Sequence, residues 1–491
     1  GPVGAPDLAA ALALPLDAVA QALAELEAEG VVFRGRYDAR RPDEQWCERT
    51  VLERIHRLTL SRLRAEIEPV GPAAFTDFLC RWQRVGPDAR LHGVAGLQEI
   101  LAQLQGLECP ALAWERDLLA VRVADYRPEL LDQLTLSGAF IWGRVASAAP
   151  SAEAVTTGPG VAPPIAFLRR ADLGWLRAAG DQRTESLGGT ARATLAALES
   201  RGALFLDELA RLLRLEPHDV LAALWELSRA GLLTSDGFHA VRLLGSLEGR
   251  QGLRRAQAKN RPSRSALRLR VSLRTLPGRW SLLPPGEAVP DVRAEAWADL
   301  LLVRYGIVFR ELAQGEDGCP PWRELAPLYR RREFAGTVRR GLFVQPASGE
   351  QYALPAAVDH LREARRRPSE RLLVLSAADP ALGYGTVFSE PRLPRHPGHL
   401  IVLRGGRALL GLEGTRLWTA ADLTDDTLND ALGALIAERR GRRLVVETWH
   451  DTPIFAWLRL GLLADLGFHG DGERLTYDGY PGPRPRPLGS L

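Results

Sequence analysis

A helix, a turn, a second helix and a hairpin follow one another within residues 202–244, and this order constrains the fold more than any other feature of the sequence. A short leucine stripe precedes Pro217, which opens a second apolar helix that ends at Gly231. Apolar residues on both sides of a turn at Asp236 and Gly237 predict a two-stranded wing. The stretch therefore predicts a winged helix-turn-helix.

The same pattern occurs near the N-terminus, where residues 7–30 align without a gap with residues 208–231. The identical pairs include Leu8 with Leu209, Leu12 with Leu213, Leu14 with Leu215, Val19 with Val220, Leu23 with Leu224, Glu25 with Glu226, Leu26 with Leu227 and Gly30 with Gly231. A repeat with so long a spacing predicts an array of similar modules.

The composition is that of a globular protein, with 46% apolar and 25% charged residues. A chain of 491 residues is too long for one core and predicts roughly three to five domains of ~100–150 residues. No run of about 18 uncharged apolar residues occurs, and the N-terminus lacks a basic leader, so we expect no membrane partner and a cytoplasmic location. The four cysteines show no metal-binding or disulfide spacing.

Charge is distributed unevenly along the chain. The net charge is only +3, but nine basic residues and no acid lie between Gln251 and Gly286. Such a local positive field suits a phosphate backbone. The sequence contains no methionine, not even at its first position, from which we expect a fragment of a longer polypeptide.

The predicted fold class is mainly α with smaller β elements (α+β), as tandem winged-helix modules followed by a small β-barrel. The expected order is a winged helix (1–45), a long helix plus winged helix (46–145), a linker (146–185), a winged helix (186–250), a basic connecting segment (251–290), a winged helix (291–367), a β-barrel or sheet (368–420), a C-terminal α/β module (421–480) and a disordered tail (481–491).

The modules differ in the charge of their second helix. In the first module this helix carries Asp17, Glu25, Glu27 and Glu29 and no basic residue, so it predicts packing against protein rather than DNA. The module at 291–367 has the charge expected for DNA contact. The predicted nucleic-acid-binding residues are Arg254, Arg255, Lys259, Arg261, Arg264, Arg330, Arg331, Arg332, Arg339 and Arg340. A solvated face is an equally good interpretation of the run at Arg330.

Several catalytic motifs are absent from the sequence. There is no GxxxxGK[ST] loop, and the only lysine, Lys259, lies in AQAKNRP, so this chain has no P-loop for ATP. It also lacks GxSxG, HExxH and GxGxxG. No metal or cofactor is expected within the chain.

Long runs of the sequence resemble the C-terminal region of bacterial large helicase-related (Lhr) proteins. They include ERIHRLTLSRLRAEIEPVGPAAFTDFLCRWQRV, LDQLTLSGAFIWGRV, LLVRYGIVFREL and SGEQYALPAAVDHLR. The resemblance covers most of residues 1–420 and weakens beyond. It implies an ATP- and Mg-dependent, DNA-translocating helicase motor upstream in the same polypeptide, a bacterial and nucleoid-associated location, and assembly as a homotetramer.

The same region is similar to AlkZ/YcaQ-type DNA glycosylases, which use a Gln-x-Gln or Gln-x-Asp signature in a winged helix. Gln103-Leu104-Gln105 stands at the corresponding place, so the resemblance implies that the two glutamines hold a water against the sugar of a flipped base. The alternative is a capping or solvated helix end before Gly106. Asp379 is a further candidate catalytic carboxylate, for which a turn before Pro380 is the competing interpretation.

We therefore expect the non-motor, C-terminal region of an Lhr-type DNA helicase that acts in DNA repair, binds DNA and holds protomers together. One alternative is a DNA glycosylase that excises uracil or a damaged base. A second is an oligomerisation scaffold without other activity.

Overall fold

A computed structural model describes residues 1–479 apart from 39–40, 42, 66–67, 146–163, 178–186, 240, 243–276, 386, 389–393, 395, 397 and 440–441. Side chains of residues 60–65 are likewise outside the description. The chain divides into two compact units: residues 1–68 with 339–342, and residues 69–338 with 343–491. The predicted tail at 481–491 and most of the linker and basic segment lie outside the described residues.

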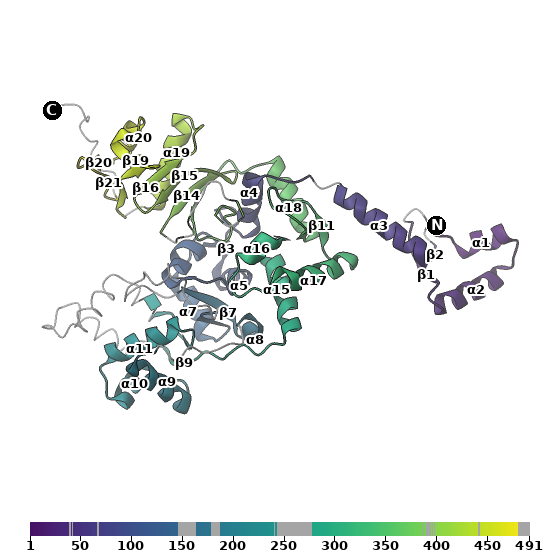
Figure 1. The fold of residues 1–491 in the computed structure, drawn as a ribbon, viewed down its shortest axis with the longest axis horizontal. Helices are drawn as coiled ribbons and strands as arrows, with labels where there is room; N and C mark the ends of the chain where they lie inside the picture. Colours follow the sequence, from purple (N-terminus) through teal and green to yellow (C-terminus); the bar gives the residue numbers. More distant parts are fainter. Residues whose placement is uncertain are drawn as a thin grey trace. The chain divides into compact units, whose positions relative to one another are not determined.

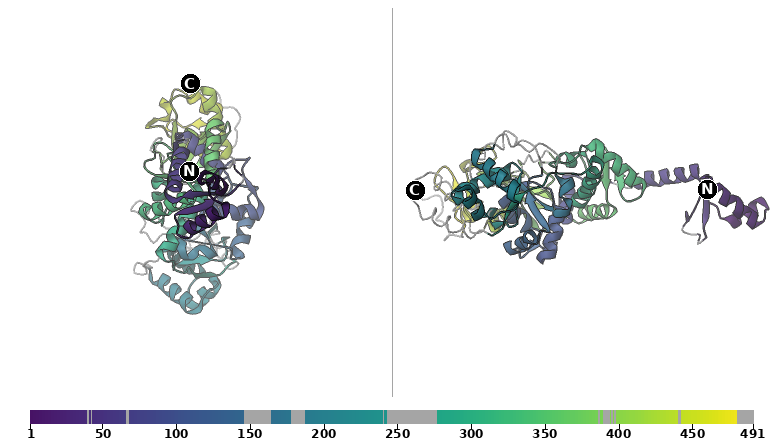
Figure 2. Two further views of the ribbon diagram at one scale, coloured as in Figure 1. Left: turned by 90° about the vertical axis from the view of Figure 1, so that its right-hand side faces the viewer. Right: turned by 90° about the horizontal axis from the view of Figure 1, so that it is seen from below.

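The first unit begins with a small winged helix. Helices α1 (Ala5–Leu12) and α2 (Leu16–Ala28) precede an antiparallel hairpin of β1 (Val32–Gly35) and β2 (Gln45–Glu48). Among its described residues, Ala9, Val19, Leu23 and Val32 form a small cluster of buried apolar side chains. Helix α3 (Arg49–Ala65) follows, and α1, α2 and the hairpin gather at its N-terminal end (Figures 1 and 2). The sequence had placed Trp46 in this helix, but it pairs in β2 because the hairpin continues past residue 45.

The second unit opens with a winged helix whose first helix, α4 (Pro72–Trp82), begins at a proline after Gly71. The remaining elements are β3 (Leu91–His92), α5 (Gly93–Gln103), β4 (Cys109–Pro110), α6 (Ala111–Ala113), the π-helical turn η1 (Trp114–Leu119), β5 (Val123–Ala124), α7 (Pro128–Leu136), β6 (Phe140–Gly143) and β7 (Pro164–Arg169). Strands β6 and β7 form the wing, and β4 extends that sheet along β7.

The next winged helix contains residues 208–231, the second copy of the sequence repeat. Its elements are η3 (Arg170–Asp172), α8 (Leu173–Leu176), α9 (Gly189–Arg201), α10 (Leu206–Leu213), α11 (Pro217–Arg229), β8 (Leu233–Ser235) and β9 (Trp280–Leu282). The expected wing is wrong in one respect: β8 pairs with β9 rather than with the residues after Gly237. In β9, Trp280 places a large, fully buried side chain in the core, where it joins Phe238 and Val241 of the nearer segment.

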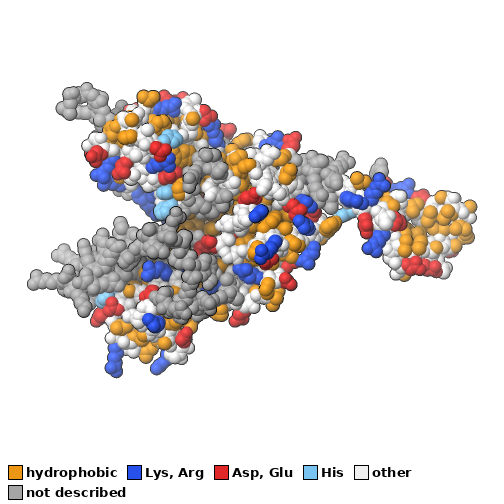
Figure 3. Space-filling view, viewed as in Figure 1, with side chains coloured by type: hydrophobic (Ala, Val, Ile, Leu, Met, Phe, Trp, Pro, Cys, Tyr) orange, Lys and Arg blue, Asp and Glu red, His pale blue; other side chains and the backbone are white. Residues whose placement is uncertain are grey.

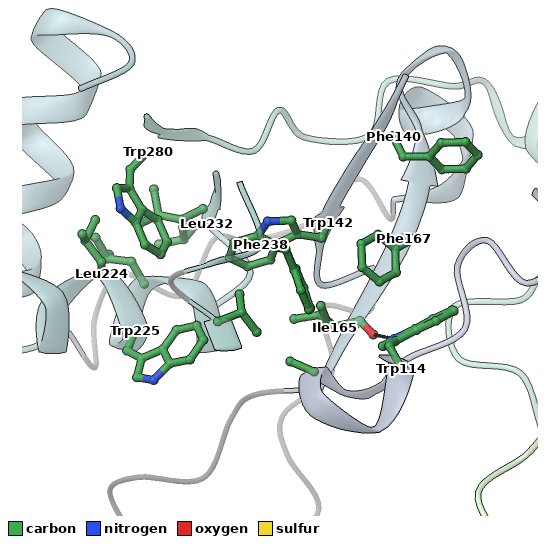
Figure 4. Packing of buried hydrophobic residues seen from close by; sticks show 14 of the residues in the cluster. Trp114, Phe140, Trp142, Ile165, Phe167, Leu224, Trp225, Leu232, Phe238 and Trp280 are labelled. Atoms are coloured by element: carbon green, nitrogen blue, oxygen red, sulfur yellow. Dashed lines mark hydrogen bonds between the residues drawn. The ribbon is translucent and has the colours of Figure 1, made fainter. Parts of the chain in front are cut away.

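These two winged helices share one hydrophobic core. Trp142 of β6 meets Trp280 of β9 and Phe238 in edge-to-face geometry, with ring centroids 6.0 and 6.2 Å apart. Figure 4 shows the three rings converging between the two sheets. Nearby, the Trp114 indole donates to the carbonyl of Ile165 at 2.9 Å, so its one polar atom is satisfied. The two modules therefore form one packed body.

A further winged helix follows without a break in the described chain. It consists of α15 (Pro290–Tyr305), β10 (Ile307–Val308), α16 (Arg310–Gln314), α17 (Trp322–Phe334), β12 (Gln351–Ala353) and α18 (Pro355–Arg366), with β10 antiparallel to β12. Strand β11 (Arg339–Gly341) lies within the segment grouped with the first unit.

The last part of the chain is built on a six-stranded sheet in the order β13-β14-β15-β16-β18-β19. These strands are β13 (Leu372–Ser376), β14 (Leu400–Arg404), β15 (Arg407–Glu413), β16 (Arg416–Thr419), β18 (Thr448–Trp449) and β19 (Thr452–Pro453). All neighbours are antiparallel except β16 and β18. Among the described residues no pairing joins β13 to β19, so the expected small β-barrel is not confirmed.

Helix α19 (Asp425–Glu438) packs against this sheet, and its N-cap Thr424 accepts a hydrogen bond from the Thr427 N–H. The remaining elements are β17 (Leu444–Val446), η4 (Ile454–Ala456), α20 (Leu460–Asp465), β20 (His469–Gly470) and β21 (Leu475–Tyr477). In the described chain no single helix has the length and hydropathy to cross a membrane, although the bent pair of α1 and α2 satisfies both criteria together.

Candidate nucleic-acid interface

Gln103 and Gln105, the glutamines proposed from the sequence as catalytic, lie at the end of α5. The side-chain amide of Gln103, the last residue of the helix, donates to the backbone carbonyls of Trp82 (3.3 Å) and Val303 (3.2 Å). These carbonyls belong to α4 and α15, so this amide ties three helices together.

Gln105 is buried, and both ends of its side-chain amide are engaged. Its Oε1 accepts a hydrogen bond from the backbone N–H of Arg169 (3.2 Å), and its Nε2 donates to a carboxylate oxygen of Asp172 (2.9 Å). A water-orienting amide needs an atom directed toward the substrate. In this conformation both polar atoms of the Gln105 side chain are already bonded to protein partners.

Arg304, near the end of α15, is fully buried and fixes the backbone at both glutamines. Its guanidinium donates to the carbonyls of Gln103 (3.3 Å) and Gln105 and pairs with the carboxylate of Glu316. Burial by itself lowers the pKa of Arg304, but attraction to Glu316 and Tyr305 outweighs burial and leaves that pKa raised. The backbone of the Gln-x-Gln segment is thus bound by a buried arginine that is itself ion-paired. A catalytic role for the segment stays a prediction.

Asp379 forms a buried ion pair with Arg122, and both side chains are 0% exposed. The pair is bidentate, with Nη1–Oδ2 and Nη2–Oδ1 distances of 2.8 and 2.6 Å. Oδ1 also accepts the N–H of Ala381 at 2.8 Å, which is the turn expected for Asp before Pro. Arg122 donates further to the Gln83 side chain (3.1 Å) and the Leu118 carbonyl (3.0 Å). The carboxylate therefore joins the sheet to a winged helix, and its catalytic role stays a prediction.

In a DNA-binding winged helix, the last helix before the wing is the recognition helix, which lies in the major groove. Four helices hold this place: α2, α7, α11 and α17. Helices α2 and α7 carry acidic and no basic residues. In α11, eight of 13 residues are buried, so it cannot enter a groove without unfolding the shared core. Helix α17 is left as the candidate.

Helix α17 directs arginines and an aromatic ring outward. The side chains of Arg323 and Arg331 are 82% and 69% exposed, that of Arg330 is also exposed, and Phe334 is 69% exposed. Residues seven and eleven positions apart fall on one side of a helix, so Arg323, Arg330 and Phe334 form one stripe. The stripe spans about 16 Å at 1.5 Å per residue.

Acidic neighbours hold most of these arginines in extended positions. Arg330 pairs with Glu350 at 3.0 Å, and Arg331 with Glu295 at 2.7 Å. Arg332 is mostly buried and pairs with Glu295 (2.9 Å) and Asp299 (2.7 Å). Exposed ion pairs of this kind contribute only about 0–1 kcal/mol. Phosphates can therefore replace the carboxylates around Arg330 and Arg331, whereas Arg332 serves the packing of α17 on α15.

The other predicted basic residues add little evidence for or against a DNA contact. Arg254, Arg255, Lys259, Arg261 and Arg264 lie outside the described residues. Arg339 and Arg340 are half-buried in β11. Conversely, Arg323 and Phe334 were not predicted from the sequence, although they stand seven residues before and four residues after Arg330, which is helical spacing.

The described residues contain no cluster of three or more His, Cys, Asp or Glu side chains that could hold a metal ion. No disulfide joins any of the four cysteines, all of which lie among the described residues. Burial raises the pKa of Cys80, and burial together with Glu316 raises the pKa of Cys319 to about 12. These two thiols stay protonated at neutral pH and are poor nucleophiles.

Comparison with known families identifies two of the winged helices. Residues 70–159 match the third, and residues 287–373 the fourth, winged-helix domain of large helicase-related proteins. The tandem winged-helix architecture is thereby confirmed.

Two curated proteins are similar to most of this chain. One, from Mycolicibacterium smegmatis, is described as "Lhr helicase/ probable uracil glycosylase" and is 33% identical over 458 residues, 89% of this chain and 29% of the relative. The other, from Escherichia coli, is described as "Lhr helicase/uracil glycosylase" and is 28% identical over 517 residues, 97% of this chain and 32% of the relative. The chain spans about a third of the length of these relatives.

Among solved structures, the Streptomyces sahachiroi DNA glycosylase AlkZ is similar at a TM-score of 0.41 and 14% identity, over 74% of this chain and 95% of that one. We draw no argument from a similarity of this size.

Proposed function

Because two of its winged helices match domains of large helicase-related proteins, we propose that this chain is a DNA-binding region of a DNA helicase and that α17 makes the principal DNA contact. The observation that carries this proposal is the exposed stripe of Arg323, Arg330 and Phe334 on the only helix of its kind, among the described winged helices, that is both basic and accessible. In this proposal an ATP- and Mg-dependent motor elsewhere in the polypeptide supplies translocation, and the whole protein serves DNA repair.

The exposed side chains of α17 suggest how it would bind DNA. An α-helix fits the major groove of DNA, which is about 12 Å wide. The guanidiniums of Arg323 and Arg331 are the most exposed and reach phosphates, while Arg330 exchanges Glu350 for a phosphate. Each phosphate neutralised releases condensed counterions, so binding falls steeply with salt.

Salt-dependent DNA binding tests this proposal. We expect the slope of log K against log salt to fall in magnitude by about 2.7 when Arg323, Arg330 and Arg331 are all replaced by Ala, at ~0.9 for each phosphate contact on duplex DNA. A control triple variant replaces Arg407, Arg443 and Arg474, which are also exposed and ion-paired but lie in the last part of the chain, beyond the winged helices.

Equal slopes for the two triple variants would remove α17 as the principal contact. Absence of salt-dependent binding by the parent chain would remove DNA binding altogether.

Self-association is a second part of the proposed function. Helices α1 and α2 and the turn between them expose Leu12, Leu14, Leu16 and Leu26, and hydrophobic side chains gather over both helices in the space-filling view (Figure 3). Acidic side chains on α2 make this face unsuited to DNA. A second copy of the chain is its proposed occupant, so light scattering should show an oligomer that Leu12→Glu and Leu16→Glu together dissociate. Monomeric parent protein would contradict this.

Base excision is the competing function, favoured by the descriptions of both curated relatives. Release of uracil from a deoxyuridine-containing oligonucleotide tests it. If Gln103 and Gln105 are catalytic, Gln103→Ala and Gln105→Ala should lose excision at a temperature at which both variants are still folded. Full activity in both variants would remove this site, and an inactive parent chain would remove the enzymatic function from this region.

A further inference from the structure

A hollow of about 520 Å³ lies where the second unit's first wing meets the next winged helix. Its wall combines the end of α7 with residues that flank α10 and the β8–β9 hairpin. The lining residues are Thr135, Leu136, Ser137, Gly138, Arg170, Phe205, Asp236, Gly278 and Arg279. It is open to solvent and contains both charged and apolar side chains.

Two arginines in the hollow are anchored by one nitrogen each. The Nε of Arg170 donates to the carbonyl of Gly138 at 3.0 Å, and the Nε of Arg279 donates to the Asp236 carboxylate at 3.0 Å. No described residue hydrogen-bonds to the Nη atoms of either guanidinium. Each side chain is therefore held in place while four N–H donors per guanidinium remain for a ligand.

Phe205 adds an exposed aromatic ring beside these donors. The preceding residue, Leu204, exchanges backbone hydrogen bonds with Trp280 at 3.0 and 2.8 Å. Side chains alternate along extended backbone, so fixing Leu204 toward the core turns Phe205 away from it. Phe205 is 44% exposed, and its neighbour in the hollow, Leu136, is exposed as well.

An aromatic face next to anchored guanidiniums is the chemistry that binds unpaired nucleotides, by stacking and by charge-assisted hydrogen bonds to phosphate. We propose that this hollow holds an unpaired nucleotide of single-stranded DNA, with the base on Phe205 and the flanking phosphates on Arg170 and Arg279. The proposal rests on DNA binding by the chain, but it names a site separate from α17 and a preference for a single strand.

Fluorescence anisotropy with labelled single strands tests the site. We expect Phe205→Ala to weaken binding of an oligothymidine by ~5- to ~150-fold, the range for loss of one stacked base. The matched control is Leu212→Ala on helix α10, which begins directly after Phe205, because Leu212 is 43% exposed but does not line the hollow. Phe205→Tyr keeps the ring and should bind as the parent does.

An abasic strand of the same length separates stacking from charge. Phe205→Ala should bind this strand like the parent, because no base remains to stack. Arg279→Gln should weaken both strands and lower the salt slope by about 0.7, the value for one phosphate of a single strand. Its control is Arg201→Gln, which lies outside the hollow.

Two outcomes would overturn the inference while leaving the proposed function intact: equal binding by Phe205→Ala and Leu212→Ala, or equal losses in Phe205→Ala and Phe205→Tyr. The second outcome would assign the loss to packing. A parent chain that binds no DNA at all would instead overturn the proposed function.

Discussion

The buried pair of Arg122 and Asp379 allows a quantitative test of whether Asp379 is structural. Asp379→Asn keeps the shape of the side chain but leaves the Arg122 guanidinium charged and buried. Removing one partner of such a pair costs about 3–5 kcal/mol. Hydrogen bonds from Arg122 to Gln83 and the Leu118 carbonyl remain, so we expect the lower end, about 3 kcal/mol.

Replacing both partners by apolar residues should cost much less, because no uncompensated charge is left. Urea unfolding followed by tryptophan fluorescence would measure the free energies of Asp379→Asn, Arg122→Met and a double variant Arg122→Met with Asp379→Leu. The control is Asp422→Asn, which breaks an exposed pair with Arg407 and should change stability by less than about 1 kcal/mol. A double variant whose loss equals the sum of the single losses would refute the reasoning.

Three further predictions concern stability. Burial raises the pKa of Asp77 in the folded state, so the fold is destabilised as the pH rises and this carboxylate becomes charged. Asp77→Asn should therefore have a higher melting temperature than the parent at pH 7 and lose this advantage below pH ~4, where the parent carboxyl is protonated. A lower melting temperature of the variant at pH 7 would contradict this. A Cβ on Gly406 would lie 2.0 Å from the Ala73 carbonyl oxygen, whereas a Cβ on Gly414 would meet nothing within 4 Å, and both glycines have positive φ. In urea unfolding, Gly406→Ala should therefore lower the free energy of unfolding by at least ~2 kcal/mol more than Gly414→Ala. Equal losses in the two variants would be inconsistent with the clash. Gln105→Ala leaves buried polar groups unpaired and should lower stability by about 1–3 kcal/mol by the same measurement, an expectation that an unchanged midpoint would refute.

The winged helices could be predicted from the sequence because their information is local. Apolar spacing, a proline at the start of α11 and a glycine at its end define a helix wherever it lies. The repeat between residues 7–30 and 208–231 then extended that prediction to the N-terminus. Charge could be assigned in the same way, since the acidic character of α2 is a property of consecutive residues.

The candidate sites were less predictable, because their partners come from distant segments. Arg122 and Asp379 are separated by 257 positions, and Arg304 lies about 200 positions from Gln103 and Gln105. Local spacing cannot indicate such pairs. The contacts of the two glutamines with α15 could therefore not be predicted from the sequence, and their catalytic role stays a prediction.

The sequence by itself determined which segments are helices, which faces are apolar and where charge accumulates. Only the tertiary structure decided that Trp280 closes the wing of β8, that α11 is buried and that α17 is exposed. The physical reason is that a periodic pattern specifies that a face must be covered, whereas the shape and charge of segments far away in the chain decide what covers it.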